Sequence, residues 1–252
     1  MRTIAVIPSR YASTRFPGKP LADICGRPMI WWIYQEARKV KEFDDIIVAT
    51  ESDKIVRVCD SYGMKSVITS DEHLTGTDRV AEVAQKVDAD LYVIIMGDEP
   101  LIHAEDERRL IQSIDNAQEA DAVMLTECFT EPVDLANMTT IKLAINDYGE
   151  LIFMSRAAIP YPKDAIGYKF YKNVGCYALK KNALDFFLNT KPGNIERAEG
   201  IELLRLIENH KKIITVPIES KSMAVDTPKD LERIRAVLSE DKEKMKILEG
   251  WV

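Results

Sequence analysis

The sequence of 252 residues has little cysteine and histidine, with four of the first and three of the second. The four cysteines stand singly, at Cys25, Cys59, Cys128 and Cys176. Without a Cys-x-x-Cys pair, they favour buried thiols in a reducing compartment over disulfide bonds or a zinc site. No stretch reaches the roughly 18 apolar residues that a membrane helix needs, and the apolar run near the N-terminus is too short for a signal peptide. We therefore expect a soluble, cytoplasmic protein.

The chain also lacks an excess of positive charge. It has 34 Lys and Arg residues against 41 Asp and Glu residues, a net charge of -7, which argues against a broad basic face for nucleic acid or an anionic membrane. The glycine patterns GxxxxGK[ST] and GxGxxG are absent, which disfavours P-loop ATPases, kinases and dinucleotide oxidoreductases. Hydrophobic residues make up 46% and charged residues 30%, the composition of a globular protein.

Short β-branched runs alternate with amphipathic runs over the first two-thirds of the chain. They predict strands at residues 4–8, 45–50, 65–69, 91–96 and 122–127. The segments between them predict helices at 28–39, at 53–62 with Ser52 as N-cap, from 77 or 78 to about 86, and at 104–116. This alternation predicts an α/β fold with a mostly parallel, doubly wound sheet. Ligands of such sheets bind outside the carboxyl ends of the strands.

The pattern changes from about residue 137. A turn at 146–149 between runs at 139–145 and 151–155 predicts an antiparallel hairpin. Further strands are expected at 172–179 and 213–218. A helix is expected after the strand 172–179, ending at residue 188. Two more are expected at 198–209 and at 228–238, the last with Thr227 as N-cap. The charged run 240–246 is read as a solvated helix face. With no internal repeat or low-complexity linker, we expect one folding unit.

Three cations, Arg10, Arg15 and Lys19, lie in the polar loop that follows the first predicted strand. Small residues separate them, and the loop lies where an α/β sheet binds its ligands. Arginine guanidinium groups donate paired hydrogen bonds to phosphate oxygens, and lysine supplies a single positive charge. The loop therefore favours a polyphosphate ligand. The alternative is an ordinary solvated loop.

Two aspartates have positions suited to a hard cation. Asp98 follows the buried strand 91–96 directly, in Gly97-Asp98-Glu99-Pro100, and Asp226 precedes the start of the last predicted helix. Mg²⁺ in phosphate chemistry takes one or two carboxylates plus substrate oxygens. Taken singly, Asp98 is equally typical of a turn and Asp226 of a helix cap. Together with the cationic loop they predict a metal–triphosphate site.

A third stretch, residues 73–79, leads from a strand into a helix. Gly76 permits close approach of the backbone to a base or sugar, and the helix N-terminus favours a negative ligand. Arg79 is placed to reach base or phosphate. A plain strand-to-helix turn has the same pattern.

Five motifs in order, PSRYASTRFPGKPL, HLTGTDR, GDEPLI, SRAAIPYP and VDTPKDLERIR, span residues 8 to 235. In these the chain resembles the cytidylyltransferases that make CMP-3-deoxy-manno-octulosonate, the CMP-Kdo synthetases. The resemblance implies a nucleotide-diphospho-sugar transferase (GT-A-like) fold with a smaller antiparallel lobe. It also implies dependence on Mg²⁺, a homodimer, and transfer of CMP from CTP to a small acidic sugar with release of pyrophosphate. The implied division of the single domain 1–252 is a nucleotide-binding half at about 1–135, an acceptor and dimerisation lobe at about 136–220, and a return to the core at 221–252.

The resemblance also implies roles for individual residues. The catalytic set is Arg10, Lys19, Asp98 and Asp226, the two aspartates being the metal ligands. The nucleotide-binding set is Pro8, Ser9, Arg10, Arg15, Lys19, Ser70, Gly76, Thr77, Arg79, Met96, Gly97 and Asp98. The acceptor-binding set is Arg156, Asn173, Tyr177, Glu202 and Leu203.

Three positions depart from the family pattern. Met96 and Leu203 stand where the family commonly has glutamine, and Asn173 stands where it has histidine. All three lie on the acceptor or base side of the implied site, so two readings stay open. One is a Kdo cytidylyltransferase; the other is the same enzyme type with a different acceptor, such as 8-amino-Kdo, an amino acid such as glutamine, a phosphonate or another capsule precursor. A silent nucleotide-binding subunit and a dinucleotide oxidoreductase fit the motifs less well.

Overall fold

The computed structural model describes residues 1–12, 16–163, 167–219, 222–241 and 244–245. Its strands are β1 (Thr3–Pro8), β2 (Asp23–Ile24), β3 (Arg27–Pro28), β4 (Asp45–Thr50), β5 (Ser66–Ile68), β6 (Leu91–Ile95), β7 (Ala122–Cys128), β8 (Lys142–Ile145), β9 (Leu151–Ser155), β10 (Tyr171–Lys180) and β11 (Ile213–Ile218). Its helices are α1 (Met29–Ala37), α2 (Asp53–Ser61), α3 (Gly76–Lys86), α4 (Ala104–Asn116), α5 (Lys181–Asn189), α6 (Asn194–Glu199), α7 (Leu204–Glu208) and α8 (Pro228–Glu240). Two 3-10 turns, η1 (Lys19–Leu21) and η2 (Pro132–Ala136), complete the elements.

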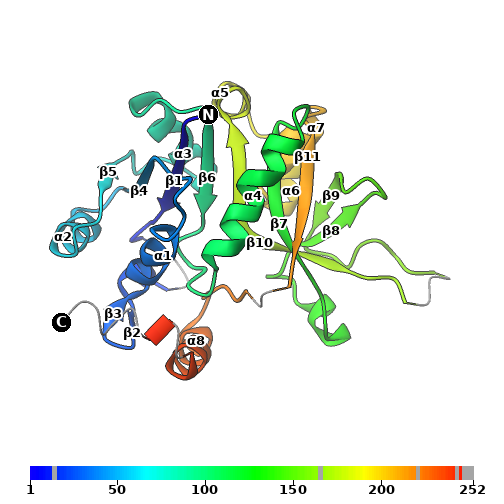
Figure 1. Cartoon of the computed structure of the whole chain (residues 1–252). Coiled ribbons are helices and arrows are strands. Elements are labelled where there is room, and N and C mark those ends of the chain that lie inside the picture. The colour runs from blue at the N-terminus through cyan, green and yellow to red at the C-terminus, as the bar shows by residue number, and fades with distance from the viewer. Residues whose placement is uncertain (13–15, 164–166, 220–221, 242–243, 246–252) are drawn as a thin grey trace.

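The centre of the molecule is a sheet with strand order β11-β7-β10-β6-β1-β4-β5 (Figure 1). β1 pairs in parallel with β4 and β6, β4 with β5, and β7 with β11. β10 runs antiparallel between β6 and β7, and its first residues also pair with the β8–β9 hairpin. The mostly parallel α/β architecture with a smaller antiparallel part is therefore confirmed. β10 and β11, from the segment expected to form the smaller lobe, belong to the central sheet.

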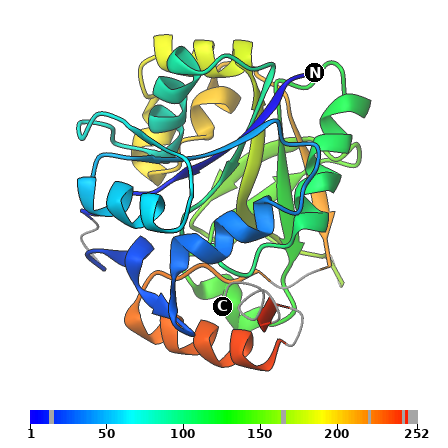
Figure 2. The same cartoon turned by 60° about the vertical axis from the view of Figure 1, so that its left-hand side comes forward.

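Helices cover both faces of the sheet, which explains why its central strands β1 and β6 are buried along their whole length. Along β1, Ala5 and Ile7 pack with α1, α2, α4 and α8 on one face, whereas Ile4 and Val6 pack with α3, α5 and α7 on the other. α8 lies beyond α1, next to β2 (Figures 1 and 2). None of the helices in the described ranges is long and apolar enough to cross a membrane.

Side-chain caps fix where the site-bearing helices begin. Thr75 caps α3 and Thr227 caps α8, each reciprocated by an aspartate three residues later in a capping box. α3 therefore begins at Gly76, slightly earlier than expected, and Thr227 is the N-cap predicted for α8. Asp226 lies just outside that box, which leaves the capping of α8 to Thr227.

Two sequence predictions are wrong. The single helix expected at 198–209 is two, α6 and α7, because Gly200 adopts the left-handed backbone (φ 63°) that ends a helix. The charged run 240–246 is not simply a solvated face. Within it Lys244 is buried, and its Nζ donates to the carbonyls of Pro100 and Ile102 at 3.3 and 3.1 Å.

Candidate functional site

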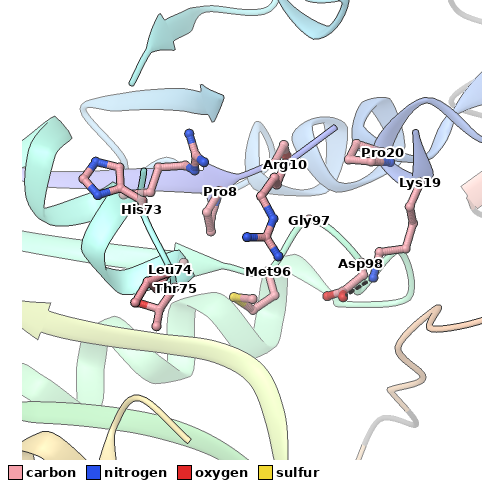
Figure 3. A pocket seen from close by; sticks show the side chains of 13 residues that line it. Pro8, Arg10, Lys19, Pro20, His73, Leu74, Thr75, Met96, Gly97 and Asp98 are labelled. Atoms are coloured by element: carbon pink, nitrogen blue, oxygen red, sulfur yellow. Dashed lines mark hydrogen bonds and ion pairs between the residues drawn. The ribbon is translucent and has the colours of Figure 1, made fainter. Parts of the chain in front are cut away.

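A cavity of about 210 Å³ opens at the carboxyl ends of β1 and β6. It is lined by Pro8, Ser9, Arg10, Lys19, Pro20, His73, Leu74, Thr75, Gly76, Arg79, Met96, Gly97 and Asp98. Arg10 and Lys19 reach it from the loop after β1, and Met96 to Asp98 from the end of β6 (Figure 3). The structure thus brings together the three motifs that the sequence placed after separate strands.

Gly97 allows the ends of β1 and β6 to meet. A Cβ at this position would lie 2.7 Å from Oγ of Ser9 and 2.8 Å from the carbonyl oxygen of Pro8. The Ser9 hydroxyl can turn away, but the backbone carbonyl of Pro8 cannot, so only glycine fits. The close approach places Asp98 directly opposite the loop that carries Arg10 and Lys19.

The ammonium of Lys19 lies between two carboxylates. Its Nζ is 2.6 Å from Oδ2 of Asp98 and 4.0 Å from Oδ1 of Asp226. The backbone N–H of Val225 donates to the carbonyl of Asp98 at 2.9 Å, which fixes the segment carrying Asp226 against the end of β6. Two carboxylates that already share a cation have the donor chemistry that Mg²⁺ needs beside a triphosphate. The described ranges hold no cluster of three or more His, Cys, Asp or Glu side chains suited to a metal.

Glu99, next to this pair, is a buried carboxyl that sequence analysis passed over. Its Oε1 accepts from the N–H of Gly175 at 3.2 Å, and its Oε2 accepts from Oγ of Ser222. Burial, and then the charge of Asp98, raise the pKa of Glu99 to about 7. A Cβ at Gly175 would lie 2.7 Å from Cγ of Glu99, so β10 approaches closely only because it carries glycine there. Glu99 thereby joins β10 and the segment before α8 to the end of β6.

A second cavity, of about 650 Å³, adjoins the first and shares Leu74, Thr75, Gly76 and Met96 with it. Its remaining lining is Asp78, Ile141, Met154, Asn173, Tyr177, Pro192, Glu196, Arg197, Gly200, Ile201, Glu202, Leu203 and Arg205. Four of the five residues of the expected acceptor set are among these. All three departures from the family pattern also line this cavity, and Met96 stands on the wall between the two.

A hydrogen-bond network crosses the floor of the second cavity. The hydroxyl of Tyr177 donates to Oε1 of Glu202 at 2.7 Å and lies 2.9 Å from Oγ1 of Thr77. Oε2 of Glu202 accepts from the N–H of Thr77 at 3.1 Å. Burial, and then the charge of Glu202, hold the pKa of Tyr177 well above its usual value. The hydroxyl therefore stays protonated and keeps Glu202 oriented.

Several expected site residues lie elsewhere. Arg15 is outside the described residues. Ser70 is not among the lining of either cavity, and its N–H donates to Glu82 at 2.8 Å. Thr77, in the first turn of α3, is fully buried, lines neither cavity, and has its hydroxyl 2.9 Å from that of Tyr177.

Arg156 is likewise absent from the lining of both cavities. Its guanidinium donates to backbone carbonyls, at 2.9 Å to Glu199, 3.1 Å to Met138 and 3.3 Å to Gly200. In this arrangement Arg156 joins the segment before β8 to the end of α6. Arg197 is the exposed arginine on the rim of the second cavity, where it donates to the carbonyl of Pro192 and to the side chain of Asn194.

Comparisons with known proteins identify the family and the fold of the chain. Residues 4–213 match the family model described as cytidylyltransferase. The chain is 34% identical to the 3-deoxy-manno-octulosonate cytidylyltransferase of Escherichia coli over 95% of its length and 97% of that protein. It is 38% identical to the enzyme of the same name from Koribacter versatilis, over 94% of this chain and 90% of that one. A solved structure of CMP:2-keto-3-deoxy-manno-octonic acid synthetase complexed with CTP superposes with a TM-score of 0.91 at 34% identity, covering 96% of this chain and 100% of that one.

Proposed function

The chain belongs to the cytidylyltransferase family and is a CTP-dependent nucleotidyltransferase, and on this premise we propose that its acceptor is 3-deoxy-manno-octulosonate or a close 2-keto-3-deoxy acid. The reaction transfers CMP to the acceptor and releases pyrophosphate, and its product serves surface polysaccharide biosynthesis. The observation that carries this proposal is the pair of adjoining cavities, one lined by cations and Asp98, the other large enough for a small acid.

The shared wall sets where the reaction takes place. Because Gly76 and Met96 line both cavities, a triphosphate in the first and an acceptor in the second meet there. The acceptor oxygen attacks the α-phosphorus in line and forms a new P–O bond. The bond between the α-phosphorus and the oxygen that bridges to the β-phosphate breaks, and pyrophosphate leaves with that oxygen. Holding the two reactants in this geometry supplies a large part of the rate.

Cationic side chains stabilise the charge that develops during transfer. Arg10 and Lys19 face the first cavity, where they neutralise the triphosphate and the departing pyrophosphate. We assign Arg15 of the same loop to this group as well. Asp98 and Asp226 are the residues that would hold Mg²⁺, which supplies neutralisation of phosphate oxygens when bound. The acceptor hydroxyl releases its proton to solvent as the new P–O bond forms.

Two arginines are candidates to bind the acceptor's carboxylate. Arg156 is the position implied by the family resemblance, but its guanidinium would have to leave four carbonyl partners to do so. Arg197 already lies on the cavity rim. We therefore assign first contact with the carboxylate to Arg197, with Arg156 holding the wall behind it.

A different acceptor is the second candidate function, and the lining of the second cavity is what favours it. Met96, Ile141, Met154, Ile201 and Leu203 give this cavity an apolar side. A sugar acid rich in hydroxyls finds few partners there, whereas 8-amino-Kdo, glutamine, a phosphonate or another capsule precursor presents a different pattern of polar groups.

We further propose a cytoplasmic homodimer. Exposed apolar side chains gather on the segment around the β8–β9 hairpin, with Met138, Tyr148, Ile152 and Tyr161 at 56 to 87% exposure. Such a surface is typical of a contact between copies. The four cysteines are free thiols, as a reducing compartment requires. Sedimentation at several protein concentrations tests the dimer, and Ile152→Lys is expected to dissociate it.

The test of the activity is pyrophosphate release with CTP and Mg²⁺ across a panel of acceptors: Kdo, 8-amino-Kdo, sialic-type keto acids, glutamine and simple phosphonates. Strong turnover with Kdo supports the first assignment. No pyrophosphate release with Kdo, together with turnover of another acid, supports the second. No pyrophosphate release with any acceptor, from a protein that binds CTP, contradicts both assignments.

A further inference from the structure

Glu51 lies directly after β4, at the same edge of the sheet as the first cavity, but does not line that cavity. Its carboxylate is mostly buried and joins two parts of the nucleotide site. Oε1 accepts from the backbone N–H of Tyr11 at 2.8 Å and from that of Ala12 at 3.4 Å. Oε2 lies 3.1 Å from Nη2 of Arg79.

The contact with Tyr11 extends to Lys19. The carbonyl of Tyr11 accepts from the N–H of Gly18 at 2.9 Å, and Gly18 adopts a left-handed backbone with φ 71°. A Cβ on Gly18 would touch the ring of Tyr11 at 3.4 Å, so the ring covers this turn. Lys54 packs over the same ring, with Nζ 4.5 Å from the ring centre. Because Lys19 follows Gly18, a carboxylate that holds Tyr11 also sets where the Lys19 ammonium points.

The second contact of Glu51 is with the guanidinium of Arg79. Arg79 is only 2% exposed, its Nη1 donates to Oγ1 of Thr69, and the residue lines the first cavity beside Arg10. Burial lowers the pKa of Arg79, the charge of Arg10 lowers it further, and the carboxylate of Glu51 opposes both. A buried guanidinium next to a second arginine needs such a counter-charge to stay in place.

We propose that Glu51 is a positioning residue for CTP. It holds the backbone of the loop after β1 and the Arg79 guanidinium in one arrangement, so that the cationic side chains are already in place when the nucleotide binds. This inference rests on the proposed function, because it takes CTP as the ligand of the first cavity. Glu51 acts through Tyr11 and Arg79 and touches no substrate itself.

The test compares Glu51→Ala with Glu51→Gln. Alanine removes all three contacts, and we expect kcat/KM for CTP to fall by about 100-fold, the loss typical of catalytic groups displaced by about 1 Å. Glutamine keeps an oxygen for the N–H groups of Tyr11 and Ala12 but loses the charge facing Arg79. We expect it to lose only about tenfold, a partial rescue. The KM for the acceptor is expected to stay unchanged in both variants.

Direct binding of CTP, measured by calorimetry without acceptor, gives a second readout. The dissociation constant is expected to rise in parallel with the loss of kcat/KM. Asp53→Asn is the matched control, because it removes an exposed carboxylate two residues away at the start of α2. It is expected to match the wild type in both assays.

Glu51→Gln in an Arg79→Gln background adds a check on the route of action. If Glu51 acts partly through Arg79, its substitution reduces CTP affinity clearly less in that background than in the wild type. Equal CTP affinity in the wild type and a folded Glu51→Ala variant overturns the inference. A wild-type protein that fails to bind CTP overturns the proposed function instead, so the two failures are distinct.

Discussion

The Nζ of Lys19 lies 2.6 Å from Oδ2 of Asp98, although the two residues are 79 positions apart in the chain. The loop after β1 and the turn after β6 therefore meet in one charged contact, which Asp226 approaches from the segment before α8. Two carboxylates around one ammonium form a site where cationic charge is already favourable. A divalent ion and the phosphates of CTP would share this place with Lys19.

Asp98→Asn and Asp226→Asn are each expected to reduce pyrophosphate release by about 100-fold or more, because each removes a charge that helps hold the cation beside the phosphates. The Mg²⁺ concentration for half-maximal rate is expected to rise. Mn²⁺ binding in the presence of CTP, followed by electron paramagnetic resonance, reports the same loss without relying on turnover.

Glu232→Gln is the control for these two variants. Glu232 lies on the exposed side of α8, six residues after Asp226, and its carboxylate pairs with Arg235 one turn further on. Its substitution is expected to leave the rate and the Mg²⁺ dependence unchanged. Near-normal turnover of Asp98→Asn at saturating Mg²⁺ would show that the metal assignment is wrong.

Arg197→Ala is expected to raise the KM for the acceptor by about 10- to 100-fold, the range for loss of one charge-assisted hydrogen bond, and to leave the KM for CTP unchanged. Arg156→Ala is expected to lower the melting temperature instead, because it frees the carbonyls of Met138, Glu199 and Gly200. Lys191→Ala, which removes an exposed cation near the same rim without lining the cavity, serves as the control. The reverse pattern, an acceptor KM that depends on Arg156 alone, refutes the assignment to Arg197.

Leu203→Gln tests what the apolar side of the second cavity does. Leu203 is 3% exposed, so a glutamine amide there needs a polar partner from the acceptor. We expect discrimination in favour of Kdo over less hydroxylated keto acids to increase by about tenfold or more. Leu188→Gln, on the exposed side of α5, is the control. No change in the ratio of kcat/KM values among acceptors would show that position 203 does not contact the acceptor.

The sequence predicts well those features that depend on neighbouring residues. The apolar runs of β4 and β11 and the cap at Thr227 lie where local pattern places them. The strand–loop positions of Lys19 and Asp98 likewise follow from the rule that ligands bind at the carboxyl ends of parallel strands. What local pattern does not reveal is which strands become neighbours, and β10 illustrates this by entering antiparallel between β6 and β7.

Residues that act over long distances in the chain are missed for the same reason. Glu51 binds Tyr11 across 40 positions, and Glu99 binds Ser222 across 123. Neither contact has a periodic or motif signal. For Glu51 the available clue is its place directly after a buried strand, which Asp98 shares. Arg156 illustrates a different limit: a motif match indicates a residue but not where its guanidinium points, and here it points to backbone carbonyls.

Glu107 predicts a pH dependence of stability. Its side chain is fully buried in α4, and neither carboxyl oxygen has a hydrogen-bond partner within the described residues. Burial, and then the charge of Glu36, raise the pKa of Glu107 well above 4.5; the charge of Asp106 adds to this, while Lys244 and Arg108 oppose it. Between 4.5 and that raised pKa the folded chain holds a proton that the unfolded chain has released. The contribution of Glu107 to the free energy of unfolding is therefore fully present below about pH 4.5. It is lost as the pH rises from 4.5 to the raised pKa of the folded chain.

Glu107→Gln removes the titration while keeping the shape of the side chain. The variant is expected to match the wild type near pH 4 and to become progressively more stable than the wild type as the pH rises, by about 2–4 °C in melting temperature for each kcal/mol recovered. Thermal unfolding followed from pH 4 to pH 9 measures this difference. Glu105→Gln, an exposed neighbour on α4 paired with Arg108, is expected to show no such trend. A gap between Glu107→Gln and the wild type that stays constant across this range would mean that Glu107 ionises alike in the folded and unfolded chain, because only a proton held by one state and not the other gives stability a slope with pH.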